Sequence, residues 1–128
     1  MRFRLVVALF FMMGMLLAVP ALSQSVDSIR AAAEKGDPIA QTTMGALYRH
    51  GMGVPQSDKD SAQWYLKAAN QGNAGAQTVV GVMYMEGKGV EKDEAKARSW
   101  LQKAAKQGDT TANSQLKSMR KTVSIDVE

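Results

Sequence analysis

Residues 68–90 read AANQGNAGAQTVVGVMYMEGKGV, and residues 32–54 carry a variant of the same string, AAEKGDPIAQTTMGALYRHGMGV. The two are offset by 36 positions, the spacing that also separates Gly36, Gly72 and Gly108. The same step relates further identical residues: Gly45 and Gly81, Tyr48 and Tyr84, Gly51 and Gly87, Gly53 and Gly89, Val54 and Val90, Trp64 and Trp100, Lys67 and Lys103, and the pair Ala68, Ala69 with Ala104, Ala105. A fixed period of roughly 20–50 residues indicates a repeat architecture, in which units too small to bury a core alone stack to share one. Such proteins usually work through an extended surface, so the period favours binding over catalysis.

Two helices are predicted in each unit. Asp37 is a favourable N-cap and Pro38 suits the first helical position, so the first helix begins there. The glycines after residue 50 and Pro55 end it, because glycine adopts the left-handed conformation of a helix end and proline cannot continue a helix. The predicted helices cover residues 38–50, about 58 until Gly72, 74–86 and 93–107.

Partial copies of the unit flank the two complete ones. Residues 26–35 align with the end of a second helix, and residues 110–121 align with a first helix. In the latter, Lys117 replaces the repeat glycine and Arg120 the repeat tyrosine, which is typical of a polar cap on a helical stack. The sequence therefore predicts an all-α, right-handed α/α solenoid of about two full repeats flanked by two half repeats. The predicted domain spans 24–121, with repeats at 37–72 and 73–108, a capping helix at 110–121 and a flexible tail at 122–128.

Glycine recurs inside the first helix of each unit, at Gly45 and Gly81. Glycine costs a helix interior about 1 kcal/mol relative to alanine, so its recurrence predicts the close approach of a neighbouring backbone. The repeated aromatic residues fall on apolar helix faces and are expected to fill the core between helices, in preference to stacking on a ligand: Tyr48, Tyr84, Trp64 and Trp100.

The first residues have the pattern of a secretory signal peptide. Arg2 and Arg4 precede an uncharged apolar run over 5–18, and small residues follow, so cleavage is expected after Ser23 or, alternatively, after Ala21. A retained membrane anchor is the competing interpretation, but the run is shorter than the roughly 20 residues that a spanning helix needs. We therefore expect a periplasmic or secreted protein without stable membrane insertion after cleavage.

The composition excludes several classes of function. Without Arg2 and Arg4 the chain has 14 lysines and arginines against 12 acidic residues, with no basic run of the kind that binds nucleic acid. It contains no cysteine, which removes disulfides, thiol catalysis and cysteine-bound metals. The stability of an exported form must therefore come from packing.

Candidate catalytic and metal-binding residues are isolated from one another. His50 is the only histidine and has no second ligand at helical spacing, so we predict no metal site. The methionines lack the cysteine and histidine partners of copper sites, and the glycine-rich turns lack the spacing of phosphate-binding loops. The serines have no neighbouring base. We predict no cofactor and no catalytic residue; an enzyme or binder acting on cell-wall peptides or a β-lactam is kept as an alternative, which would have to use His50, Arg49 and Glu86.

Several of these motifs together resemble the Sel-1-like repeat family of tetratricopeptide-type helical hairpins. The motifs are AANQGNAGAQ at 68–77, Gly81, Tyr84, GKGV at 87–90, Trp100 and KAA at 103–105. The resemblance extends over about 32–115 and departs from the usual pattern at Leu101, where tyrosine is common. It implies a protein-interaction scaffold, often exported in bacteria, and it transfers no catalytic residue.

In tetratricopeptide-like hairpins the first helices line the concave face, so the positions that point away from the repeat glycine and tyrosine are candidate partner contacts. They are Ile39, Thr42, Thr43, Ala46, Arg49 and His50 in the first unit, and Gly75, Thr78, Val79, Val82, Met85 and Glu86 in the second. This small, mildly apolar groove suits an extended peptide or a helix. Alternatively it is a solvated face, and contacts are made by loops or termini. The sequence thus predicts a periplasmic adaptor or regulator that binds another envelope protein; an immunity protein neutralising a secreted periplasmic effector is a variant of this hypothesis.

Overall fold

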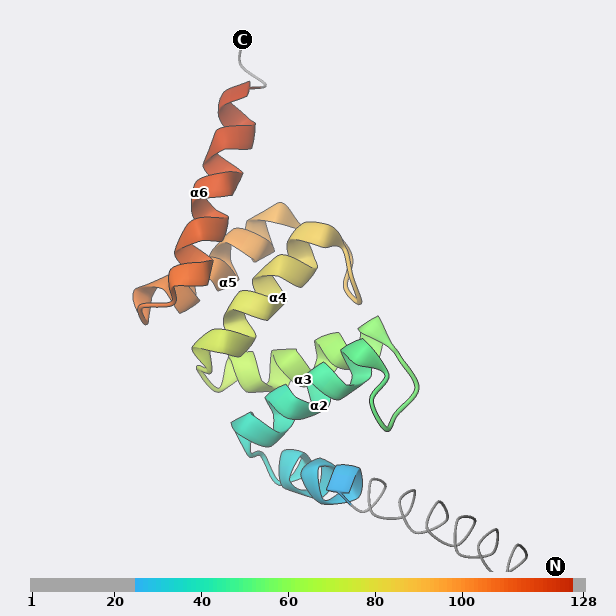
Figure 1. The fold of residues 1–128 in the computed structure, drawn as a ribbon. Helices are drawn as coiled ribbons and strands as arrows, with labels where there is room; N and C mark the ends of the chain where they lie inside the picture. The colour runs from blue at the N-terminus through green and yellow to red at the C-terminus, as the bar shows by residue number, and fades with distance from the viewer. Residues whose placement is uncertain (1–24, 126–128) are drawn as a thin grey trace, which may run out of the picture.

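The computed structural model describes residues 25–125, and the regular secondary structure in this part of the chain is helical, without a strand. Residues 25–34 are helical. They are followed by α2 (Pro38–His50), α3 (Asp58–Asn70), α4 (Ala74–Glu86), α5 (Glu94–Lys106) and α6 (Thr110–Ile125). Helices α2 and α3 form one hairpin and α4 and α5 the next, and α3 packs on α4 and α5 on α6 (Figure 1). The prediction of an all-α helical repeat solenoid is confirmed.

The helix boundaries follow from the predicted capping residues. The Asp37 side chain accepts hydrogen bonds from the backbone N–H groups of Ile39 and Ala40, and Pro38 opens α2. Gly51 ends α2 in the left-handed conformation, at φ 64°. Helix α5 is one residue shorter at each end than predicted, because Asp93 and Gln107 are its caps.

The last helix is longer than the sequence indicated. Helix α6 continues four residues beyond the predicted end at Lys121, to Ile125, so residues 122–125 are helical and not part of a tail. The predicted signal peptide at 1–23 and the last three residues of the predicted tail lie outside the described residues.

The glycines inside α2 and α4 accommodate side chains of the second helices, and the predicted close backbone is found at Gly81 alone of the two, where an added Cβ would lie 3.2 Å from the carbonyl oxygen of Ala97. A Cβ atom at Gly45 would lie 2.7 Å from Cδ2 of Tyr65, and one at Gly81 would lie 2.6 Å from Cγ of Leu101. Each glycine thus leaves a slot that a large residue of the second helix fills, and Tyr65 and Leu101 are both buried. Burial raises the pKa of Tyr65, although the guanidinium of Arg49 lowers it in part.

A closer backbone approach occurs at Gly89, in the turn after α4. A Cβ atom there would overlap the backbone carbonyl group of Asp58, the first residue of α3. Gly89 also has a φ of +71°, which only glycine adopts without strain. The turn of the second unit is therefore seated directly on the start of α3 in the first.

The repeated aromatic residues lie at the edges of the core and are half-buried. Tyr48 and Trp64 pack against a core cluster of Ala33, Ala40 and Met44. Tyr84 and Trp100 pack against the core cluster that α3 and α4 form. The Nζ atoms of Lys67 and Lys103 lie 4.1 and 4.3 Å from the ring centroids of Trp64 and Trp100. The exposed side of each indole is thus covered by a cation, as is favourable for an aromatic ring.

A pair of glutamines joins the first complete unit to the helix before it. Gln41 is buried and donates from Nε2 to the carbonyl oxygen of Ala33, at 3.1 Å. Gln71 donates from Nε2 to the carbonyl oxygen of Gly36, at 2.9 Å, and to Oε1 of Gln41, at 2.8 Å. We call this arrangement the glutamine clip; it ties the ends of three helices together.

The junction between the two complete units carries the same clip. Gln77 donates to the carbonyl oxygen of Ala69 at 3.2 Å. Gln107 donates to the carbonyl oxygen of Gly72 at 3.0 Å and to Oε1 of Gln77 at 2.9 Å. In α6 the corresponding residue is Asn113, whose shorter amide donates to the carbonyl oxygen of Asp109 in its own helix, at 3.3 Å. The series of clips ends there.

The clip should contribute measurably to stability. Replacing Gln77 with alanine leaves the carbonyl oxygen of Ala69 without its side-chain donor and Gln107 with one acceptor fewer, so we expect a loss of about 1–3 kcal/mol in the free energy of unfolding. Gln63→Ala is the matched control, because Gln63 is exposed on α3 and should change stability by less than about 0.5 kcal/mol. Urea denaturation measures both. Equal effects of the two substitutions would show that the clip does not contribute to the free energy of unfolding.

Candidate functional site

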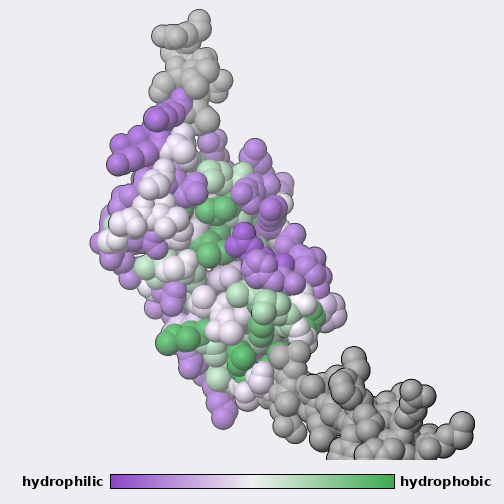
Figure 2. Space-filling view, in the orientation of Figure 1, coloured by the Kyte–Doolittle hydropathy of each residue, from purple (hydrophilic) through white to green (hydrophobic). Residues whose placement is uncertain are grey.

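The candidate surface is formed by the first helices of the successive units. Ala46 of α2 packs against a core cluster that includes Ala76, Val80 and Met83 of α4, and α4 in turn contacts α6. Seen in the orientation of Figure 1, apolar side chains gather over α4 and α2 between hydrophilic margins (Figure 2). The surface is thus continuous across the unit junction.

The predicted contact positions differ in exposure. Ile39 is 72% exposed, an unusual state for a large apolar side chain. Gly75 and the residues at the C-terminal ends of the helices are also exposed: Arg49, His50 and Glu86. Six positions are half-buried: Thr42, Thr43, Ala46, Val79, Val82 and Met85.

Thr78 does not belong to the surface. Its side chain is only 7% exposed, which corrects its assignment as an outward position. The hydroxyl donates to the carbonyl oxygen of Ala74 one turn earlier in α4, at 3.2 Å. This bond satisfies the hydroxyl inside the helix, so Thr78 can be buried without another polar partner.

Some of the remaining positions also support the fold. Ala46 and Val79 pack against the core cluster of α3 and α4, and Met85 packs against the cluster of α5 and α6. Arg49 interacts with the hydroxyl of buried Tyr65. Substitutions at these four positions therefore combine effects on stability with effects on binding. Ile39 and Val82 are the cleaner probes of the surface, because neither is among the residues that pack against a core cluster.

Met85 also lines a hollow where α4, α5 and α6 meet. The hollow has a volume of about 280 Å³, and its other lining residues are Lys92, Glu94, Ser118 and Met119. Its floor of two methionine side chains is apolar, and its rim carries one cation and one carboxylate. The hollow widens the candidate surface toward the C-terminal end of the stack.

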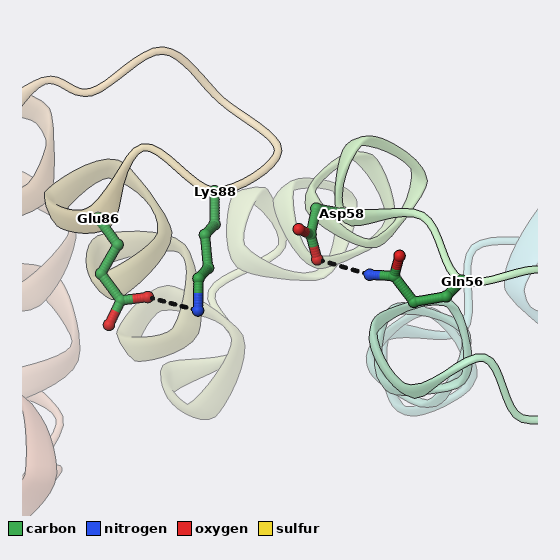
Figure 3. A network of polar contacts seen from close by, with 4 residues as sticks. All are labelled: Gln56, Asp58, Glu86 and Lys88. Atoms are coloured by element: carbon green, nitrogen blue, oxygen red, sulfur yellow. Dashed lines mark hydrogen bonds and ion pairs between the residues drawn. The ribbon is translucent and has the colours of Figure 1, made fainter.

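The loops that follow α2 and α4 form one margin of the surface; loops were predicted from the sequence only as alternative contact sites, without specific residues. Figure 3 shows Lys88 on the loop after α4, with its Nζ 3.5 Å from Oε2 of Glu86, and Gln56 donating to Oδ1 of Asp58 at 2.9 Å (Figure 3). One period before Lys88 the first loop carries Met52, which is 58% exposed. The margin is therefore apolar beside the first unit and charged beside the second. The sequence signal for this difference between the two loops was the alignment of Met52 with Lys88 at the 36-residue offset.

Neither metal ligands nor a membrane span is assembled in the described part of the chain. Within residues 25–125, no group of three or more histidine, cysteine or acidic side chains is placed to hold a metal ion. No helix in the same range combines the length and the apolar character needed to cross a bilayer.

Comparisons with solved structures return helical repeat proteins. A Sel1 repeat protein from Oxalobacter formigenes shares 45% identity with a TM-score of 0.74, over 76% of this chain and 28% of that one. A protective antigen of uropathogenic Escherichia coli that displays an SLR fold shares 40% identity, also with a TM-score of 0.74, over 76% of this chain and 21% of the antigen. Cysteine rich protein B of Helicobacter pylori shares 26% identity with a TM-score of 0.68, over 71% of this chain and 68% of that one.

The chain thus spans less than a third of the length of the first two structures. A search among functionally curated proteins gave no match. The family model of the Sel1 repeat matches at two adjacent places, residues 38–73 and 74–109, and these two matches cover more than half of the chain. Each match contains one hairpin and one glutamine clip, and the chain belongs to the Sel1 repeat family.

Proposed function

We propose that this protein is an exported adaptor or regulator that binds another protein of the bacterial envelope through the surface of α2 and α4. Sel1 repeats mediate protein–protein interactions and are in general not catalytic, which supports a protein partner. The pattern of a signal peptide over residues 1–23 supports export to the periplasm.

The observation that carries the proposal is the open apolar centre of the surface. Ile39 and Val82 present aliphatic side chains on neighbouring units, and the charged residues Glu86 and Lys88 lie at the margin. An apolar centre with a polar rim is the usual anatomy of a protein interface. A surface built from the first helices of two successive units suits one extended segment or one helix of the partner.

The proposal is tested by site-specific photo-crosslinking with the full chain in cells. A crosslinking amino acid at Val82 should yield a defined adduct with one envelope protein, while the same group at Ser99, which is exposed on α5, should not. The adduct should fractionate with the periplasm, and its N-terminus should lie at residue 24 or 22.

A second variant separates binding from folding. Ile39→Asp should reduce the Val82 adduct at least tenfold, because a charge replaces an exposed apolar contact, while the melting temperature stays close to that of the unsubstituted chain. Gln63→Asp, on the exposed side of α3, should leave the adduct unchanged. The proposal is wrong if crosslinking from Ser99 and Val82 gives the same products, or if Ile39→Asp has no effect on the adduct.

A further inference from the structure

Positive charge is concentrated at the C-terminal end of the stack. Residues 25–94 contain seven lysines and arginines and nine acidic residues, whereas residues 95–128 contain seven lysines and arginines and three acidic residues, Asp109, Asp126 and Glu128. Helix α6 itself contains no aspartate or glutamate. The nearly balanced composition of the whole chain therefore conceals a strong polarity along the stack.

Three of these cations share one face of α6. Ala112, Leu116 and Met119 turn toward the core that α6 forms with α5. Lys117, Arg120 and Lys121 are exposed, and their spacing of three and four residues places them together on another side of the helix. We call these three residues the cationic end face.

The end face occupies the side of α6 that a second helix covers in the complete units. Lys117 stands where α4 has Gly81, against which Leu101 packs, and Arg120 stands where α4 has Tyr84. In the part of the chain that the structure describes, this side of α6 is exposed. Lys117 and Lys121 form no ion pair with the described residues, so their charge is available to a partner.

We propose that the cationic end face docks on an anionic phospholipid surface. A protein partner would need a buried aromatic or aliphatic anchor, since a few such residues supply most of the energy of protein interfaces. The end face has only exposed cations and, beside them, the exposed amide of Asn113. A surface of closely spaced, laterally mobile phosphates matches such a face, because each lysine or arginine near it strengthens binding by about fivefold without an anchor.

The exposed lysines of α5, Lys103 and Lys106, add to the attraction from the same end of the molecule. Docking through α6 places the stack on the membrane by its end, and the surface of α2 and α4 remains free to hold its partner. The proposal of membrane docking does not depend on the protein partner of α2 and α4, so an experiment can contradict either proposal without affecting the other.

Vesicle co-sedimentation tests the proposal, with the full chain purified in the processed form that the cell delivers. The vesicles are phosphatidylcholine alone or equal parts of phosphatidylcholine and phosphatidylglycerol. We expect binding to the anionic vesicles to exceed binding to the neutral ones, and to weaken as salt is raised from about 20 to about 200 mM, because salt screens exposed charges. The triple variant K117Q/R120Q/K121Q should lose roughly 100-fold in affinity for the anionic vesicles.

The matched control removes the same charge elsewhere. K35Q/K59Q/K67Q takes three exposed cations from the N-terminal half of the stack and should lose less than about fivefold. Equal losses in the two triple variants would overturn the proposal, since net charge alone would then explain binding. It would also be overturned if the protein did not distinguish the two vesicles, or if it bound polyglutamate but not anionic vesicles, which would indicate an acidic protein partner.

Discussion

Gly89→Ala should lower the free energy of unfolding by about 2–5 kcal/mol, the largest effect expected of any single methyl group in this chain. Two costs combine. The left-handed backbone at φ +71° costs a residue with a Cβ atom about 1–2 kcal/mol. The new Cβ would also overlap the carbonyl group of Asp58, and because that group belongs to the backbone of α3 it yields only if the two units move apart.

Gly87→Ala is the control for the backbone term. Gly87 has nearly the same φ, +68°, but the atoms nearest to its Cβ would belong to Lys92 of its own loop, with Cβ at 3.2 Å and the backbone nitrogen at 3.5 Å. The difference between the two variants in the free energy of unfolding, measured by urea denaturation, therefore reports the contribution of the contact between the turn and α3. If Gly87→Ala and Gly89→Ala are equally destabilising, the contact between the turn and α3 does not stabilise the stack.

Gly81→Ala is expected to cost about 1–3 kcal/mol, because the added methyl overpacks a filled slot. The nearest atom is Cγ of Leu101, at 2.6 Å, which is a branch point and not a flexible end, and the carbonyl oxygen of Ala97 is 3.2 Å away. The usual gain from replacing a helical glycine is about 1 kcal/mol and is too small to offset this. Gly75→Ala in the first turn of the same helix should be neutral or stabilising, since its Cβ would meet only Oδ1 of Asn73, at 3.5 Å.

A double-mutant cycle identifies the cause. If the clash with Leu101 is responsible, Gly81→Ala should cost much less in a Leu101→Ala background than in the unsubstituted chain, giving a coupling of roughly 0.5–3 kcal/mol. Strictly additive effects in thermal or urea unfolding would mean that Gly81 is required for another reason.

The hairpins could be predicted from the sequence because the period and the caps are local signals. Asp37, Pro38 and Gly51 fix the ends of α2 whatever lies beside it. The residues that fill the glycine slots could not be predicted in this way. Tyr65 and Leu101 occupy equivalent positions of the repeat, but the period does not show which side chain packs against each glycine.

The candidate surface was harder to predict because it depends on neighbours. Counting helix faces assigned Thr78 outward, as it did its equivalent Thr42, yet only Thr42 remains half-exposed. The charge polarity was missed for a related reason. Lysines and acids alternate along much of the chain, whereas one face of α6 gathers three like charges, Lys117, Arg120 and Lys121.

The glutamine clip has a consequence for how such arrays grow. Both side chains of the second clip, Gln77 and Gln107, lie within one 36-residue unit, and outside that unit they contact only the backbone carbonyl groups of Ala69 and Gly72. Backbone acceptors are supplied by any preceding unit, whatever its sequence. A tandem gene duplication of one unit would therefore include both glutamines of the clip. The copy could form the hydrogen bonds of the clip without a compensating substitution in the unit that it joins.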